Sequence, residues 1–171
     1  MDAFDGLRPL DDSYAARPVS EAFDWSSVAS ALPVGAEWYL VAFRSIRRPG
    51  CDEARLCDFD ERAHLEAEAA PGFVHYFKGP RAADGSCLSF CLWDSRAHAR
   101  AAAAGPNHRA AVELLHEMYS AYTLEFARVT HPQGSAALRF EPYDAVAPAE
   151  AHRPVRSPLA SLSPLPDPAA S

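Results

Sequence analysis

The sequence predicts an α+β domain whose elements follow the β-α-β-β-α-β order of the ferredoxin-like fold. Four segments have the aromatic and β-branched composition typical of strands, at residues 37–44, 72–78, 86–93 and 122–130, and residues 137–140 could add a short fifth strand. Helical segments separate the first strand from the second and the third from the fourth. This order is typical of an antiparallel sheet with helices on one face.

The first helix is predicted from its two ends and from one apolar stripe. Asp52 can cap its first turn, and Pro71 and Gly72 end it after about Ala69. Four apolar side chains recur between these ends at helical spacing: Leu56, Phe59, Ala63 and Ala67. We expect the helix to lie on the sheet by this stripe.

The second helical region is predicted to consist of two pieces. Asp94 or Ser95 can cap the first piece, which an alanine run continues until Gly105 and Pro106 interrupt it. Helix resumes at His108, after which apolar residues recur every three or four positions: Ala111, Leu114, Leu115, Met118 and Tyr122. This spacing predicts a second stripe that faces the core.

Three regions divide the 171 residues: an N-terminal extension (1–35), the ferredoxin-like domain (36–143) and a tail (144–171). The tail is rich in Pro, Ala and Ser, a composition that does not support a packed core, and we predict that it is disordered. In the extension, Ser20 could cap a short helix that pads the surface of the domain. That helix would carry three apolar side chains: Phe23, Val28 and Leu32.

Charge and hydropathy exclude several classes of partner. The net charge of −7 and the pI near 5.4 are unlike those of a nucleic-acid binder, which needs a clustered basic surface. No stretch approaches the ~18 uncharged apolar residues of a membrane span, and the acidic start is unlike a signal peptide. We therefore predict a cytoplasmic protein that binds neither nucleic acid nor a membrane, with its four cysteines reduced.

The predicted strands are apolar on both faces, since hydrophobic residues fill odd and even positions alike in 37–44 and 86–93. Helices on one face of a single sheet leave the other face bare, and a bare apolar face needs a partner. The simplest partner is a second copy of the chain, so we expect a symmetric homodimer in which two sheets face each other.

Two segments resemble the dimeric α+β barrel proteins and, within them, the antibiotic-biosynthesis-monooxygenase-like group. Residues 90–95 read FCLWDS, similar to the group's strand that ends in Trp, an acidic and a small residue. After an alanine-rich helix, residues 105–112 read GPNHRAAV, similar to the helix break of that group. With the element order, the resemblance covers residues 37 to about 130. It implies a dimeric barrel with a pocket between sheet and helices.

Members of the group that the chain resembles oxidise aromatic polyketides without a cofactor, open haem or cyclise polyketides, and many have no assigned activity. Haem-degrading members use an Asn on the first strand and a Trp and a His along the second helical region. An approximate alignment places Arg44, Ala102 and Val112 at those positions, which disfavours haem degradation. Quinone-forming members have Trp, Tyr and His near the pocket, and the chain is similar in offering all three residue types.

His75 and His108 are the candidate catalytic residues. His75 stands in the middle of a predicted strand, on the same face as Phe73 and Phe77, where a neutral imidazole could transfer a proton. The alternative is a hydrogen-bonded core histidine. His108 begins the last helix beside the break at Gly105, and helix starts present free N–H groups to ligands. The alternative there is a surface or capping residue.

Trp93, Tyr76, Arg44 and Tyr119 are the candidate substrate-binding residues. Trp93 could form a wall of an aromatic pocket, and the tyrosines offer phenol donors. Arg44 could bind a carboxylate or enolate through its planar fork. The alternatives are a core anchor for Trp93 and a surface position at a strand end for Arg44. We expect no metal site and no cofactor.

We predict a small dimeric enzyme: a cofactor-independent monooxygenase, or a related catalyst, that acts on an aromatic or polyketide-like metabolite. His75 or His108 would generate a substrate carbanion, and the substrate itself would supply electrons to oxygen. The alternative is a noncatalytic ligand-binding or interaction protein of the same fold. The predicted partners are a small-molecule ligand and a second copy of the chain.

Overall fold

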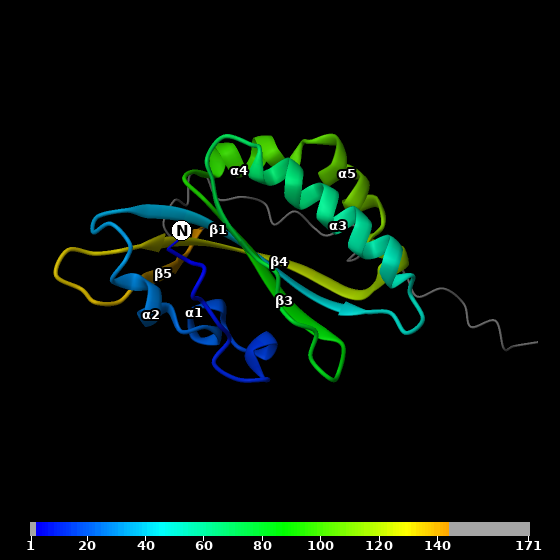
Figure 1. Ribbon diagram of the computed structural model, residues 1–171, viewed down its shortest axis with the longest axis horizontal. Coiled ribbons are helices and arrows are strands. Elements are labelled where there is room, and N and C mark those ends of the chain that lie inside the picture. The colour runs from blue at the N-terminus through cyan, green and yellow to red at the C-terminus, as the bar shows by residue number, and fades with distance from the viewer. Residues whose placement is uncertain (1–2, 144–171) are drawn as a thin grey trace, which may run out of the picture.

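A five-stranded antiparallel sheet with the strand order β2-β3-β1-β4-β5 is the centre of the structure, a computed structural model that describes residues 3–143 (Figure 1). Its strands are β1 (Glu37–Arg47), β2 (Phe73–Phe77), β3 (Ser86–Trp93), β4 (Tyr119–Thr130) and β5 (Arg139–Pro142). The α-helices are α1 (Val19–Ala22), α2 (Trp25–Ala29), α3 (Glu53–Glu68), α4 (Arg96–Ala103), α5 (Pro106–Glu113) and α6 (Leu115–Met118). The order of β1 to β4 with α3 and α4–α6 confirms the ferredoxin-like fold. The tail predicted for residues 144–171 lies outside the described residues.

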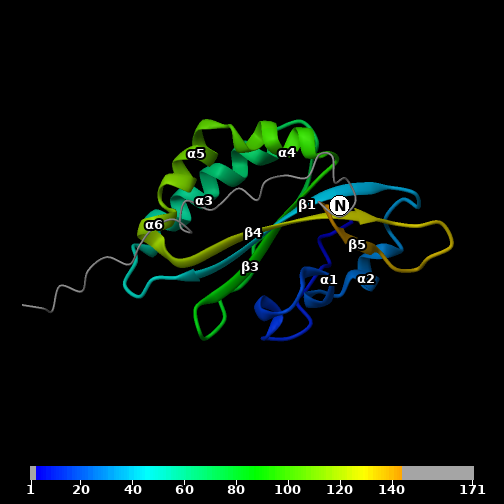
Figure 2. The same cartoon turned by 180° about the vertical axis from the view of Figure 1, so that it is seen from behind.

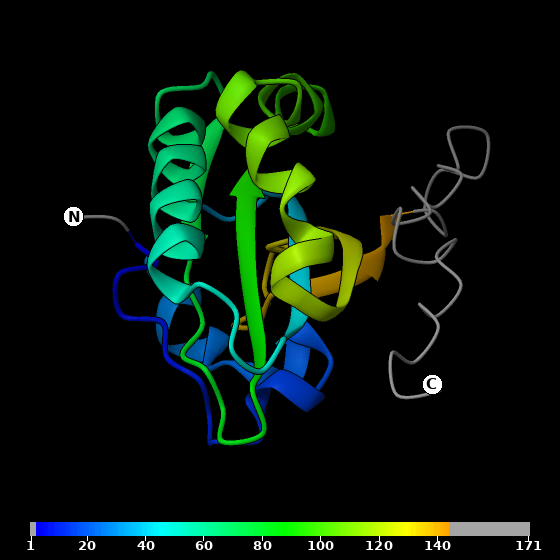
Figure 3. The same ribbon diagram turned by 90° about the vertical axis from the view of Figure 1, so that its right-hand side faces the viewer.

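Helices α3, α4 and α5 form one layer over the sheet (Figures 1 and 3). Seen from behind, α6 leads from α5 into β4, and α1 and α2 lie on the opposite side of the sheet, near β5 (Figure 2). Within residues 3–143, no helix has the length and apolar character needed to cross a membrane.

Local capping explains where the long helices begin. The Asp52 carboxylate accepts a hydrogen bond of 2.9 Å from the Arg55 amide at the start of α3, as predicted. Of the two candidates for α4, Ser95 is the cap, and its hydroxyl accepts a bond of 3.3 Å from the His98 amide. Helix α5 begins at Pro106, inside the predicted break and two residues before His108, because proline suits the first turn of a helix.

The end of the second helical region differs from the prediction. Helix α5 ends at Glu113, α6 ends at Met118, and the strand predicted for residues 122–130 begins three residues earlier. Strand β4 therefore starts at Tyr119, which pairs with Arg47 of β1 next to a shift in register. The spacing of apolar residues every three or four positions predicted a helix here. The residues from Tyr119 onward form a strand instead, because they pair with the backbone of β1, with which β4 pairs through most of its length.

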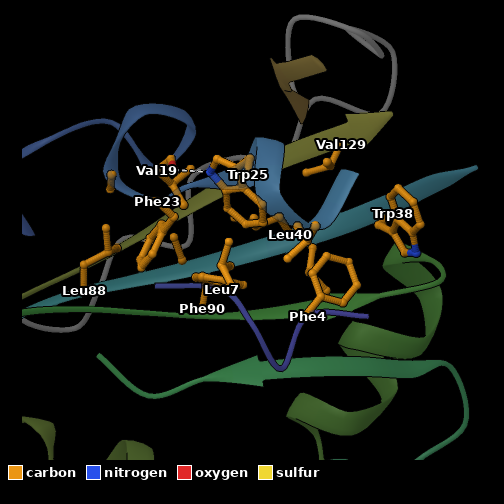
Figure 4. Packing of buried hydrophobic residues seen from close by; sticks show 14 of the residues in the cluster. Phe4, Leu7, Val19, Phe23, Trp25, Trp38, Leu40, Leu88, Phe90 and Val129 are labelled. Carbon is orange, nitrogen blue, oxygen red and sulfur yellow. Dashed lines mark hydrogen bonds between the residues drawn. The ribbon is translucent and has the colours of Figure 1, made fainter. Parts of the chain in front are cut away.

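An N-terminal segment, residues 4–32, covers the face of the sheet that lies opposite α3–α5 (Figure 4). Its buried side chains form one hydrophobic cluster with Trp38 and Leu40 of β1, Leu88 and Phe90 of β3, and Val129 of β4. The prediction that this face is bare is therefore wrong, because residues of the same chain bury it. If the segment stays in place, two copies of the chain must meet through another surface.

The N-terminal segment contains two short helices, α1 and α2, of which only α2 has a side-chain cap. Ser20 was predicted to cap a helix, but it lies inside α1 and caps nothing. Asp24 instead caps α2, and its carboxylate accepts a hydrogen bond of 3.2 Å from the Ser27 amide. The Trp25 indole N–H donates to the Val19 carbonyl oxygen at 2.9 Å, which links α2 to α1 (Figure 4). The segment therefore does more than pad the surface as predicted, since it supplies about half of the residues of this core.

Gly79 follows β2 and lies against Leu88 of β3 and Tyr14 of the N-terminal segment. A Cβ atom at this position would lie 2.0 Å from the Leu88 carbonyl oxygen and 2.5 Å from the Tyr14 hydroxyl. We expect Gly79→Ala to lower the free energy of unfolding by about 2 kcal/mol, because a backbone atom must shift. Chemical denaturation measures the change. Gly6→Ala is the matched control, since a Cβ there meets no atom within 4 Å. Equal stability of the two variants would contradict this close approach.

Candidate functional site

A cavity of about 300 Å³ lies between the sheet and the layer formed by α3, α4 and α5. Its floor comes from alternate residues of β1, which include Tyr39, Val41 and Phe43, and from neighbouring residues of β2, β3 and β4. The residues between them on β1, such as Leu40, face the N-terminal segment. The cavity and the N-terminal segment therefore use opposite faces of the same sheet.

Aromatic rings form much of the cavity wall. Trp93 is 4% exposed, and its ring meets that of Phe73 edge to face at a centroid distance of 5.5 Å. Tyr39 and Phe126 stack on the floor, 6.0 Å apart. Rings arranged in this way present flat apolar surface to a ligand, and their edges and faces favour other aromatic groups. The cavity is thus suited to an aromatic or otherwise flat apolar molecule.

A polar group centred on Asp60 of α3 interrupts this apolar lining. The Tyr76 hydroxyl donates to Asp60 Oδ1 at 3.2 Å, and Lys78 Nζ donates to Asp60 Oδ2 at 2.5 Å. Burial, and then the Asp60 charge, raise the pKa of Tyr76 well above its usual value. Tyr76 is therefore a neutral phenol at physiological pH, and its one proton is directed to Asp60.

His108 lies in the first turn of α5 and lines the cavity. Its backbone N–H donates to Glu66 Oε2 at 2.9 Å, and the Asn107 amide donates to Glu66 Oε1 at 3.3 Å, so that Glu66 of α3 caps α5. Burial lowers the pKa of the His108 imidazole, and the nearby Glu66 charge opposes that shift. The imidazole is therefore neutral at pH 7 and can accept a proton.

Two phenols and one guanidinium occupy another part of the cavity. Tyr119 and Tyr122 lie with ring centroids 5.5 Å apart, and Arg47 pairs with Tyr119 across the β1–β4 ladder. Burial raises the pKa of Tyr119 to about 12 and that of Tyr122 further. Both hydroxyls are consequently protonated and able to donate hydrogen bonds to a ligand.

The structure brings four of the six predicted site residues together around the cavity: Trp93, Tyr76, Tyr119 and His108. It places His75 on the opposite face, where its ring lies 5.3 Å from Phe4 and 6.2 Å from Phe90. A register shift between Phe73 and His75 puts these two residues on different faces, contrary to the prediction.

Arg44 is also on the face away from the cavity. Its guanidinium forms an ion pair with Glu125 and donates to the carbonyl oxygens of Ala15 and Arg17, each at 2.5 Å. Arg44 thus holds the N-terminal segment on the sheet. The prediction that it binds substrate is not supported, because its side chain does not line the cavity.

Four residues of the site were not predicted from the sequence: Arg47, Lys78, Glu66 and Asp60. His64, which also lines the cavity, pairs with Glu68 at 3.3 Å. Two signals were available. Asp60 falls on the same helical stripe as Leu56 and Ala63, where a carboxylate is unexpected, and Arg47 shares the odd positions of β1 with the floor residues. Within residues 3–143, the His, Cys, Asp and Glu side chains form no group of three that could hold a metal ion.

Comparison of the whole chain with known families gives one match that spans most of it. The family model described as PB2B2.08-like matches residues 1–142. The chain belongs to the PB2B2.08-like family. The UPF0643 protein PB2B2.08 of Schizosaccharomyces pombe is 28% identical over 144 residues, which cover 75% of this chain and 66% of that protein. The match to the PB2B2.08-like family includes the N-terminal segment, so the covering of the sheet lies inside the family region.

Solved structures with a similar fold include SnoaB, a cofactor-independent oxygenase from Streptomyces nogalater, at 21% identity and a TM-score of 0.43 over 57% of this chain and 95% of that one. Another is a dimeric ferredoxin-like protein of unknown function from Thermobifida fusca, at 15% identity and a TM-score of 0.45 over 56% and 93% of the two chains. These likenesses are likenesses of fold.

Proposed function

We propose that this chain binds a small aromatic molecule in the cavity between sheet and helices, and that His108 acts on it as a general base. The observation that carries the proposal is the combination of aromatic walls with one neutral imidazole that lines the same cavity. A base works best when its pKa lies near the working pH and when it can reach the proton that it removes.

The reaction that we propose is the monooxygenation of an electron-rich phenol or a related polyketide. In the simplest case a phenol and O₂ give a quinone and water, so that atoms balance and the substrate supplies all the electrons. His108 Nδ1 or Nε2 would take the first proton, which leaves an anion electron-rich enough to meet oxygen. Trp93 and the floor rings would hold the substrate and keep water away from this anion.

A noncatalytic ligand-binding protein is the second candidate, and one observation favours it. His75, the other predicted base, lies on the opposite face of the sheet and cannot reach the cavity. The homodimer and the small-molecule ligand expected from the sequence remain part of both proposals.

We expect His108→Gln to lower oxygen uptake with phenolic and quinol substrates by at least about 100-fold, the usual scale for loss of a general base. The measurement is an oxygen-electrode screen, with ligand affinity followed in parallel by calorimetry. Affinity should stay within a few fold, because the aromatic walls are unchanged. His98→Gln is the matched control, since His98 is exposed on α4 and pairs with Asp94 outside the cavity.

The pH dependence provides a second readout for the same residue. Because burial lowers the pKa of His108, turnover should fall with decreasing pH through an apparent pKa below the ordinary 6.5 of histidine, and should stay level above it. Turnover that is equal in the wild type and in His108→Gln would remove the base from the mechanism. Ligand binding without turnover by any substrate would favour the noncatalytic protein.

A further inference from the structure

Arg47 has a partly buried side chain whose guanidinium has no hydrogen-bond acceptor among residues 3–143. Its side chain is 21% exposed and lines the cavity. The nearest carboxylate, Glu53, is 3.9 Å away, beyond hydrogen-bond distance, and it is already bound by Arg81 at 2.5 Å. A guanidinium that has lost part of its water and gained no acceptor becomes more stable when a ligand supplies one.

The charge of the cavity lining points in the same direction. The described lining residues include three cations, Arg47, Lys78 and Arg100, and one carboxylate, Asp60. Asp60 pairs with Lys78, and the long contact of Arg47 with Glu53 is to a carboxylate outside the lining, so the lining itself keeps an excess of positive charge. The chain as a whole carries a net charge of −7, so this positive lining is opposite in sign to the rest of the protein. Such a cavity favours an anion over a neutral ligand.

Two phenol donors accompany Arg47. The hydroxyls of Tyr119 and Tyr122 line the cavity and form no hydrogen bond with any other residue in the part of the chain that the structure describes. Because both phenols stay protonated, they can donate to an oxygen anion. A planar fork with two additional O–H donors matches a carboxylate, which accepts two parallel bonds from arginine.

We propose that the aromatic ligand of this cavity is a carboxylic acid whose carboxylate binds Arg47, Tyr119 and Tyr122. This inference rests on the proposed function, since it names the chemical class of the molecule that the same cavity binds.

The position of Arg47 relative to His108 sets the shape of that acid. Arg47 lies near Glu53 in the first turn of α3, whereas the first turn of α5 with His108 is bound to Glu66 near the other end of that helix. Between these two glutamates α3 rises by about 20 Å. The acid group and the proton that His108 removes therefore lie at opposite ends of an elongated molecule.

A rigid aromatic acid suited to a first test is 4′-hydroxybiphenyl-4-carboxylic acid, with a carboxylate at one end and a phenol at the other. Its neutral control is the corresponding 4-carboxamide. Calorimetry on the full chain gives both dissociation constants. We expect the acid to bind at least about tenfold more tightly than the amide, as for a charge-assisted bidentate pair. Arg47→Gln should weaken binding of the acid about tenfold or more and leave binding of the amide within about twofold.

Arg48→Gln is the matched control, because Arg48 is the next residue, carries the same charge and lies outside the cavity lining. It should leave both affinities unchanged. If Arg47→Gln does not fold, as circular dichroism would show, Tyr119→Phe replaces it: this variant keeps the ring, removes one donor and should weaken binding of the acid alone.

The outcomes separate this inference from the proposed function. Equal affinity for acid and amide in the wild type would overturn the carboxylic acid and leave aromatic binding intact. An equal loss of affinity for the acid in Arg48→Gln would also overturn it, since positive charge would then act generally. A loss of affinity in Arg100→Gln but not in Arg47→Gln would overturn it too, since the carboxylate would then bind elsewhere in the cavity. Binding of neither probe would contradict both the inference and the aromatic cavity.

Discussion

Trp25→Ala is expected to lower the free energy of unfolding by about 3–5 kcal/mol, the usual range for removing a buried aromatic ring. Trp25 is 6% exposed, and its ring lies 5.3 Å from that of Phe90 on β3 and 5.0 Å from that of Phe140 on β5. The substitution would leave a cavity between the N-terminal segment and the sheet, and the Val19 carbonyl would lose its donor. Denaturant unfolding followed by circular dichroism measures the loss.

Val34→Ala is the comparison for Trp25→Ala, since Val34 is apolar, close in sequence and 56% exposed. Its effect should stay within about 0.5 kcal/mol. If Trp25→Ala costs no more than Val34→Ala, then residues 4–32 are not part of the core, and the sheet face must be covered by something else, such as a second copy of the chain.

Arg44→Met is the second substitution with a large expected effect, about 3 kcal/mol. Methionine keeps the length of the side chain but removes every donor, so the carbonyls of Ala15 and Arg17 and the carboxylate of Glu125 each lose a partner. The Arg44 side chain is 20% exposed, so water replaces little of what is lost. Stability should fall, and trypsin should cut the N-terminal segment faster than in the wild type.

Arg62→Met serves as the control for the same chemical change in solvent. Arg62 pairs with Asp58 on α3, with side chains that are 54% and 52% exposed, and such pairs contribute between 0 and about 1 kcal/mol. If Arg44→Met lowers stability as little as Arg62→Met and leaves the rate of proteolysis unchanged, then Arg44 does not hold the N-terminal segment.

The N-terminal segment changes how this fold should be understood. A sheet with helices on one face exposes apolar side chains on the other, and here residues 4–32 bury them. Because the PB2B2.08-like match starts at residue 1, this covering is part of the family region rather than an addition to it. The second face of the sheet then stabilises the domain, while the first face and its helices form the cavity.

Several elements were predictable because their signals are local. The bounds of α3 follow from Asp52 and from the glycine after its end, and the strands β1, β2 and β3 lie within a few residues of the predicted segments. Ser95 marked the start of α4 in the same way, and Gly105 and Pro106 marked the break between α4 and α5. A cap or a helix breaker acts within one turn, so the sequence around it contains the whole signal.

Other features depend on contacts between distant residues, and the sequence did not predict them. The spacing from Leu114 to Tyr122 suits a helix, but pairing with β1 makes residues from Tyr119 onward a strand. Likewise, a register shift in β2 turns His75 away from the side of Phe73, and nothing in the local sequence marks it.

The sequence by itself determined the order of the elements, the apolar character of both sheet faces and a set of aromatic and polar residues suited to a ligand site. Tertiary structure alone decided which face would receive the helices and which the N-terminal segment. Since odd and even positions of β1 are equally apolar, alternation cannot show which of Tyr39 and Leu40 faces the cavity. Packing against α3 and against residues 4–32 makes that choice, and it places His108 and Arg47 at the cavity and His75 and Arg44 behind it.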